Sequence, residues 1–157
     1  MLLRNVSTVF NAGRPYVLLI FLLLNILVSS SVSRADDPVE IVMHLSVTST
    51  KHNFTKNSLR AIFGMRLRTW PDGMPVKVFV LPDDAPLHKA FAKQKLNVFP
   101  YQLRSAWDRL IFSGTGQAPI TVNSVDEMLT HVTNTPGAIG YLMRTKINDN
   151  IQILDVK

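Results

Sequence analysis

The sequence feature that most constrains the fold is an alternation of strand-like and helix-like segments along the chain. Runs of branched and apolar residues predict buried strands over residues 38–47, 76–81, 138–142 and 151–156. Capped or amphipathic segments lie between these runs. Strands interleaved with helices predict an α/β domain with a mixed or mostly parallel sheet flanked by helices.

The expected helix ends are marked by capping residues and by glycine. One helix is expected to begin at Asn57 or Ser58 and to end at Gly64, in a left-handed conformation. The next helix is expected to start with Asp84 as its N-cap residue. A further helix is expected over residues 101–112, because its apolar residues fall on one face.

The best-specified helix follows Ser124. Ser124 and Glu127 have the spacing of a capping box, in which the two residues satisfy each other's backbone amides. Apolar residues then recur at helical spacing, namely Val125, Met128, Leu129 and Val132. We expect this helix, like the others, to pack on the sheet.

The first 35 residues differ in kind from the rest of the chain. Two arginines precede an apolar run over residues 17–28, and Ser33 and Ala35 provide small residues just after it. A basic start, a short apolar core and small residues at the −3 and −1 positions are typical of a secretory signal peptide. The sequence therefore predicts a signal peptide over residues 1–35 and a single exported domain over residues 36–157.

An uncleaved membrane anchor is the alternative interpretation of the same segment. A membrane-spanning helix needs about 20 apolar residues, whereas this run offers roughly a dozen before serines dilute it. In that case the domain would meet the membrane only through the uncleaved segment. Both alternatives deliver the rest of the chain across a membrane.

Charge and cysteine content exclude several classes of function. The chain has 17 Lys and Arg and 11 Asp and Glu, but three of the arginines lie in the first 35 residues, so residues 36–157 carry a net charge of +3. A small positive excess without a dense basic block does not indicate a nucleic-acid partner. The chain has no cysteine, which excludes disulfides, thiolate metal sites and a cysteine nucleophile.

The histidines and acidic pairs form no recognisable catalytic or metal-binding pattern. His44, His52, His88 and His131 show no metal-ligand spacing, and we expect His88 on the surface. The adjacent acidic residues lie at expected helix starts, where they favour the helix dipole. The sequence therefore predicts no catalytic residue, no metal and no cofactor, and we expect a protein that is not an enzyme.

Two sequence signatures give the chain a family resemblance. Residues 58–64 read SLRAIFG and are followed by WPDGMPV at residues 70–76, while residues 135–141 read TPGAIGY. Further matching residues are Phe91, Trp107, Phe112, Ser113, Gly114 and Pro119. Over about residues 39–142 the sequence resembles the phosphate ABC-transporter substrate-binding proteins.

The resemblance implies a periplasmic location and, for residues 36–157, a single periplasmic-binding-protein-like domain. In the family, two α/β lobes hold an anion in the cleft between them. This chain is too short for two full lobes, so one lobe or a reduced version is expected. The resemblance also implies phosphate or a similar small oxyanion as ligand, and an inner-membrane transporter or sensor protein as partner. The alternative is a ligand-free protein-interaction or regulatory domain that docks on an envelope or membrane sensor protein.

One segment departs from the pattern of that family. After the strand expected at residues 76–81, the resemblance implies a Ser-Gly-Thr segment that wraps the phosphate, but residues 82–87 read PDDAPL. Pro86 lacks a backbone N–H, and Asp83 and Asp84 bring two carboxylates to the place where an anion would approach. We expect Asp84 to occupy the helix start in place of an external anion.

Hydroxyl groups provide the remaining candidates for ligand binding. Thr48, Ser49 and Thr50 follow the first strand, and open α/β sheets place their ligands at the carboxyl ends of strands. Ser113 and Thr115 lie in a glycine-containing segment that could form an anion nest. A polar loop and an ordinary turn are the alternative interpretations of these two segments.

Three arginines form one further candidate. Arg60, Arg66 and Arg68 lie within nine residues, and guanidinium groups bind anions and acidic partners through paired hydrogen bonds. A solvated helix end is the alternative interpretation.

Overall fold

The computed structural model describes residues 37–47 and 54–156. The predicted signal peptide and its cleavage site at Ala35 lie outside the described residues. No helix within the described part of the chain is both long enough and apolar enough to cross a membrane.

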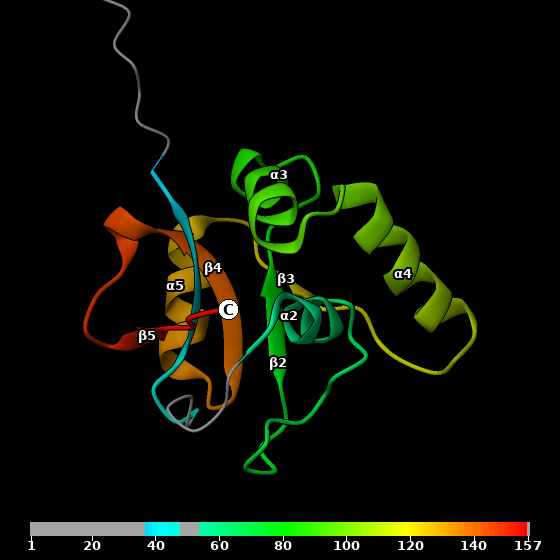
Figure 1. Ribbon diagram of the computed structural model, residues 1–157, viewed down its shortest axis with the longest axis horizontal. Helices are drawn as coiled ribbons and strands as arrows, with labels where there is room; N and C mark the ends of the chain where they lie inside the picture. Colours follow the sequence, from blue (N-terminus) through cyan, green and yellow to red (C-terminus); the bar gives the residue numbers. More distant parts are fainter. Residues whose placement is uncertain (1–36, 48–53, 157) are drawn as a thin grey trace, which may run out of the picture. The chain divides into compact units, whose positions relative to one another are not determined.

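The described residues form a five-stranded mixed sheet with the strand order β3-β2-β4-β1-β5 (Figure 1). The strands are β1 (Val39–His44), β2 (Lys77–Val80), β3 (Ile120–Thr121), β4 (Ala138–Met143) and β5 (Ile151–Ile153). β2 runs parallel to β3 and β4, whereas β1 runs antiparallel to β4 and β5. The predicted α/β fold with a mixed sheet is confirmed, although β3 was not predicted because it has only two residues.

Helices cover both faces of the sheet. They are α2 (Lys56–Phe63), α3 (Pro86–Phe91), the π-helix η1 (Ala92–Leu96), α4 (Pro100–Phe112), α5 (Val125–Asn134) and the short 3-10 helix η2 (Arg144–Lys146). Side chains alternate along β4, so Tyr141 stacks on Phe91 of α3 at 3.9 Å between ring centroids, while Gly140 faces Met128 of α5. Figure 1 accordingly shows α5 behind β4 and α2 on the near side.

The two signatures that carry the family resemblance pack against each other. The indole Nε1–H of Trp70 donates a hydrogen bond of 2.9 Å to the carbonyl oxygen of Gly137. Gly137 has φ +78°, and a Cβ there would collide with the carbonyl oxygen of Pro75, so glycine is required. Because these residues precede β2 and β4, the signatures hold the amino ends of both strands together.

Both ends of α2 differ from the expectation. Its N-cap residue is Thr55, whose hydroxyl accepts a hydrogen bond of 3.1 Å from the Ser58 N–H, so the prediction of Asn57 or Ser58 as cap is wrong. At the other end Gly64 has φ −80°, and the left-handed residue is Met65 with φ 58°. The helix therefore begins earlier than expected, because Thr55 takes the capping position, while its C-cap residue is still Gly64.

The capping box of α5 is confirmed in its main bond. The Ser124 hydroxyl accepts a hydrogen bond of 3.1 Å from the Glu127 N–H. The Glu127 carboxylate returns to the N–H of Asn123 at 2.7 Å rather than to that of Ser124. Both bonds satisfy amides at the helix start that have no partner within the helix.

Candidate functional site

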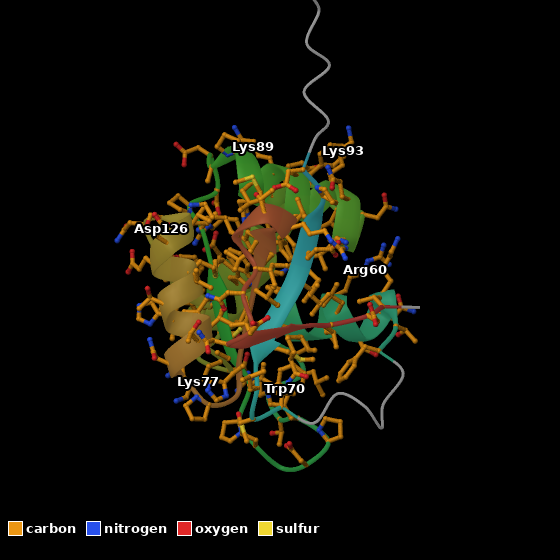
Figure 2. All side chains as sticks on the ribbon, turned by 90° about the vertical axis from the view of Figure 1, so that its left-hand side faces the viewer. Arg60, Trp70, Lys77, Lys89, Lys93 and Asp126 are labelled. Atoms are coloured by element: carbon orange, nitrogen blue, oxygen red, sulfur yellow. The ribbon has the colours of Figure 1, made fainter. Side chains whose placement is uncertain are left out.

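A groove lies beyond the end of β2, at the edge where the parallel strands β2 and β4 finish. Its volume is about 590 Å³. It is lined by Asp83, Asp84, Lys89, Lys93, Phe99, Tyr101 and Arg104, among others. We call it the carboxyl-edge groove, because open α/β sheets bind their ligands at this kind of edge. In Figure 2, Lys89 and Lys93 lie at the opposite end of the sheet from Lys77, the first residue of β2.

An arginine–carboxylate pair crosses this groove. The Arg104 Nε donates to Asp83 Oδ2 at 2.7 Å, and the Arg104 Nη2 donates to Asp83 Oδ1 at 2.9 Å. The guanidinium also lies over the Trp107 ring, 5.0 Å from its centroid. The hydrogen bond from Arg104 holds the pKa of Asp83 below its ordinary value, and the same bond raises the pKa of Arg104. Arg104 is therefore already bound to a carboxylate of its own chain.

A buried chain of hydrogen bonds lies beneath that pair. The Tyr141 hydroxyl accepts a hydrogen bond of 2.8 Å from the Leu81 N–H, and it lies 2.6 Å from His88 Nδ1. The hydroxyl accepts from Leu81, and we assign its own proton to the bond with His88 Nδ1. This assignment leaves the imidazole proton on Nε2. The Nε2 atom is buried, has no hydrogen-bond partner among the described residues, and lies 4.0 Å from Asp83 Oδ1.

Burial controls the protonation of this chain. His88 is completely buried, so the prediction of a surface position is wrong. His88 lies three residues before Phe91, and this helical spacing puts both side chains on the face that packs on the sheet. Burial lowers the pKa of His88 and raises the pKa of Tyr141, so both side chains are neutral at ordinary pH.

The outer part of the carboxyl-edge groove carries free cations and exposed aromatic rings. Lys89 and Lys93 are exposed and have no ion pair with any described residue. The rings of Phe99 and Tyr101 stack with centroids 5.7 Å apart, and both residues are more than half exposed. The groove thus presents positive charge and aromatic area outward, while Asp83 neutralises its inner cation.

Asp84 lines the carboxyl-edge groove but does not cap α3. The N-cap residue is Ala85, which makes no side-chain hydrogen bond, and Pro86 occupies the first turn. The prediction of Asp84 as the N-cap is therefore wrong. The neighbouring Asp83 is the acidic residue that binds a cation. Proline in the first turn needs no partner for its missing N–H, which removes part of the demand for a side-chain cap.

Ser113 and Thr115 lie elsewhere, beyond the C-terminal end of α4. Their hydroxyl oxygens are 2.8 Å apart, and the Ser113 hydroxyl donates to the Arg109 carbonyl oxygen at 2.7 Å. The carbonyl oxygen of Thr115 accepts a hydrogen bond of 2.8 Å from Arg68 Nη2. These contacts are those of a braced turn, and they do not bring the two hydroxyls to Asp84.

Thr48, Ser49 and Thr50 lie outside the described residues. The strand that precedes them, β1, runs antiparallel to β4, so it finishes at the amino end of β4. Ser46 already lies there, because its hydroxyl accepts a hydrogen bond of 3.3 Å from the Gly137 N–H. The described part of β1 therefore leads away from the carboxyl-edge groove.

Sequence reasoning missed the buried residues His88 and Tyr141 and the groove residues that bind or present charge and aromatic area, namely Lys89, Lys93, Phe99, Tyr101 and Arg104. The helical spacing between His88 and Phe91 is a signal that could have found the buried histidine. Tyr141 belongs to the TPGAIGY signature, but nothing local shows that its hydroxyl binds Leu81. Arg104 lies 21 residues from Asp83, and no periodicity joins positions on two different elements.

The described residues contain no group of three or more His, Cys, Asp or Glu side chains placed to hold a metal ion. What the carboxyl-edge groove offers is one internally bound guanidinium, two free ammonium groups, an aromatic pair and the exposed carboxylate of Asp84. The cations and the aromatic rings are groups that bind anions and protein surfaces through charge and contact area.

No family model matches the sequence, and no curated protein matches it. Among solved structures, the fold is similar to that of an ABC-type phosphate transport receptor from Vibrio cholerae, with a TM-score of 0.56 and 14% identity over 76% of this chain and 46% of that chain. It is also similar to PstS from Borrelia burgdorferi, with a TM-score of 0.55 and 17% identity over 77% of this chain and 47% of that chain.

The chain spans less than half the length of these structures. The similarity confirms the resemblance in fold to phosphate ABC-transporter substrate-binding proteins that the sequence signatures predict. The fold of this chain is therefore of the periplasmic-binding-protein type.

Proposed function

We propose that this chain is a binding domain of the substrate-binding type for a small oxyanion such as phosphate, with Asp83 as an internal competitor for the same place. The observation that carries the proposal is the pair of hydrogen bonds from Arg104 to Asp83 at the carboxyl edge. A guanidinium in this position binds two oxygens of one carboxylate, and it has the same complementarity to two oxygens of a phosphate.

Export to the periplasm and an inner-membrane transporter or sensor as partner belong to the same proposal. The signal-like pattern of residues 1–35 and the fold of the similar proteins support them. The role is one of binding and of signalling that binding to a membrane protein, without a catalytic step.

The internal competitor makes wild-type binding weak. A micromolar dissociation constant corresponds to roughly 8 kcal/mol, which several converging donors in a closed site normally supply. One lobe provides only part of such a shell, and Asp83 must first leave Arg104. Its charge would also repel an anion by about 1 kcal/mol at 4 Å in water, and by more where water is excluded.

The test is calorimetry with phosphate, sulfate and acetate. The protein is expressed from the full sequence and purified in the processed form that the host cell produces. Wild-type protein should bind phosphate with a dissociation constant in the high micromolar range or weaker, on the order of 5 kcal/mol. Asp83→Asn should strengthen binding by about tenfold, or 1.4 kcal/mol, because it keeps the shape and removes the charge.

Asp84→Asn is the matched control, because Asp84 lines the same groove and has no ion pair within the described residues. It should change the dissociation constant much less than Asp83→Asn does. Adding Arg104→Gln to Asp83→Asn should abolish the gain. A submicromolar wild-type constant, or equal effects of the two aspartate variants, would contradict the proposal.

A second candidate function is a protein-interaction domain that docks on an envelope or membrane sensor protein. The observation that favours it is the exposed, stacked pair of Phe99 and Tyr101 at the rim of the same groove. Exposed aromatic side chains are enriched at protein interfaces. If Asp83→Asn gains no affinity for any of the three anions, this second function replaces the first.

A further inference from the structure

A second groove lies between α2 and α4 and has a volume of about 400 Å³. Its cations are Arg60 from α2, Arg66 from the turn that follows α2, and Arg109 from α4. Apolar side chains, among them Leu103 and Leu110, line the space between these cations. We call it the arginine groove.

The positive charge of the arginine groove is not neutralised by the described residues. None of its lining residues is acidic. Arg66 and Arg109 make no side-chain hydrogen bond or ion pair with any described residue. Arg60 is held in place by bonds from Nε to the Leu96 carbonyl oxygen at 2.7 Å and from Nη1 to Asn57 Oδ1 at 3.4 Å. Three like charges that share one hollow repel each other, and a bound anion relieves that repulsion.

Helix α4 separates the two grooves. Successive residues of an α-helix are about 100° apart around its axis. Arg104, which lines the carboxyl-edge groove, therefore lies on the other side of α4 from Ala106 and Arg109, which line the arginine groove. An anion bound at one groove leaves the other free.

Two exposed apolar residues are sequence neighbours of residues that line the arginine groove. Phe112 precedes the lining residue Ser113 and is 88% exposed, and Leu67 follows Arg66 and is also exposed. A free inorganic anion makes no use of this apolar area. A protein segment that carries both carboxylates and apolar side chains uses the charge and the area together.

We propose that the arginine groove binds an acidic segment of a partner protein. Carboxylates of that segment pair with Arg66 and Arg109, and its apolar side chains cover Leu110 and Phe112. The assignment does not depend on oxyanion binding at Arg104, because the two grooves share no lining residue.

The test uses a short labelled peptide of glutamate and leucine as probe, with fluorescence anisotropy as readout and the protein purified from full-length expression. Replacing both Arg66→Glu and Arg109→Glu should weaken peptide binding by about tenfold or more, because two attractive contacts become repulsive. The matched control is Lys56→Glu with Lys77→Glu. It makes the same change in net charge at exposed lysines that line neither groove.

Two further measurements complete the design. Phe112→Ser should weaken binding of the glutamate–leucine peptide and leave citrate binding unchanged, because citrate has no apolar side chains. Circular dichroism of every variant checks that the fold is kept, and Arg66→Gln with Arg109→Gln serves as the milder replacement if a glutamate variant fails that check.

The expected result is a large loss in the arginine variants, a small one in the lysine control and a loss specific to the peptide in Phe112→Ser. Equal losses in the arginine and lysine variants would show a general charge effect and overturn the assignment. Absence of peptide binding would overturn it too. Citrate binding as tight as peptide binding, with no effect of Phe112→Ser, would replace the protein segment by a small anion.

Discussion

The two grooves beside α4 differ in how their cations are neutralised. In the carboxyl-edge groove, Arg104 donates two hydrogen bonds to Asp83 and stacks on Trp107. In the arginine groove, Arg66 and Arg109 have no partner among the described residues. The same helix thus carries one guanidinium that the fold has already bound and another that it leaves free. The comparison locates the surface that is open to an external anion without displacement of an internal one.

This difference in neutralisation also determines which kind of ligand each groove can bind tightly. A ligand at Arg104 must compete with the carboxylate of Asp83. Tight binding there therefore needs either an oxyanion that binds strongly or the removal of that charge, as in Asp83→Asn. A ligand at Arg66 and Arg109 meets no such competitor, but it also meets an open surface where single ion pairs contribute little. Multivalent attachment together with apolar contact is therefore needed at the arginine groove.

The largest expected effect comes from removing the anchor that holds α4 in place. Trp107 is buried, and its Nε1–H donates a hydrogen bond of 2.8 Å to the Phe63 carbonyl oxygen. Trp107→Ala should lower the free energy of unfolding by about 3–5 kcal/mol. Binding at both grooves should weaken together, because α4 forms a wall of each. Ile111→Ala on the exposed part of α4 is the control and should change stability by less than about 0.5 kcal/mol. Urea denaturation measures both.

The next largest effect on stability comes from the buried hydrogen bonds of Tyr141, beneath the carboxyl-edge groove. Tyr141→Phe leaves the buried Leu81 N–H and His88 Nδ1 without their hydrogen-bond partner. We expect a loss of about 1–3 kcal/mol in the free energy of unfolding. Tyr101→Phe removes the same hydroxyl from an exposed ring and should have little effect. A Tyr141→Phe variant as stable as wild type in chemical denaturation would show that the buried chain contributes nothing.

The pH dependence of stability should also depend on His88. Burial lowers its pKa in the folded protein, with Asp83 and Arg104 as the nearby charges. The unfolded chain therefore binds the proton more readily, and stability should fall as the pH drops below about 6.5, by at most about 1.4 kcal/mol per pH unit. His88→Gln should flatten the curve between neutral and mildly acidic pH, and His131→Gln on α5 is the comparison. Thermal unfolding at a series of pH values measures this, and an unchanged slope in His88→Gln would exclude the histidine as its source.

The smallest expected effect on stability comes from the N-cap of α5, a helix that lines neither groove. Ser124→Ala removes the N-cap bond to the Glu127 N–H and should destabilise the protein by about 1 kcal/mol. Anion and peptide binding should be unchanged, since α5 lines neither groove. Ser105→Ala, at an exposed position inside α4, should not destabilise the protein. A wild-type stability for Ser124→Ala by chemical denaturation would show that the cap is redundant.

Much of the fold could be predicted because its signals are local. The buried strands β1, β2 and β4 are runs rich in branched apolar residues. Helix α5 is indicated by the capping pair Ser124 and Glu127 and by the helical spacing of its apolar residues. Errors occurred where two local signals competed, as at Thr55 against Asn57 and Ser58. They also occurred where a backbone constraint at Pro86 made a side-chain cap dispensable.

The candidate site was less predictable, because its parts meet only in the folded protein. Asp83 and Arg104 are far apart in the sequence, and the expected helix start singled out Asp84 rather than Asp83. The arginine cluster was visible in sequence as Arg60, Arg66 and Arg68. Yet Arg68 turns to the Met65 and Thr115 carbonyl oxygens, and Arg109 of α4 takes its place in the groove. Only tertiary packing decides which cations share a hollow.

The contrast between the paired Arg104 and the unpaired Arg66 and Arg109 is tested most directly by the rate at which each arginine reacts with phenylglyoxal. Peptide mass spectrometry of the purified protein measures these rates. The reagent attacks accessible guanidinium groups, and hydrogen bonding to a carboxylate with stacking on an aromatic ring protects them. The account predicts that Arg66 and Arg109 are modified faster than Arg104, and that Asp83→Asn speeds the modification of Arg104 but not of Arg66 or Arg109. Equal rates at Arg104 and Arg66 in the wild-type protein, unchanged by Asp83→Asn, would contradict the account.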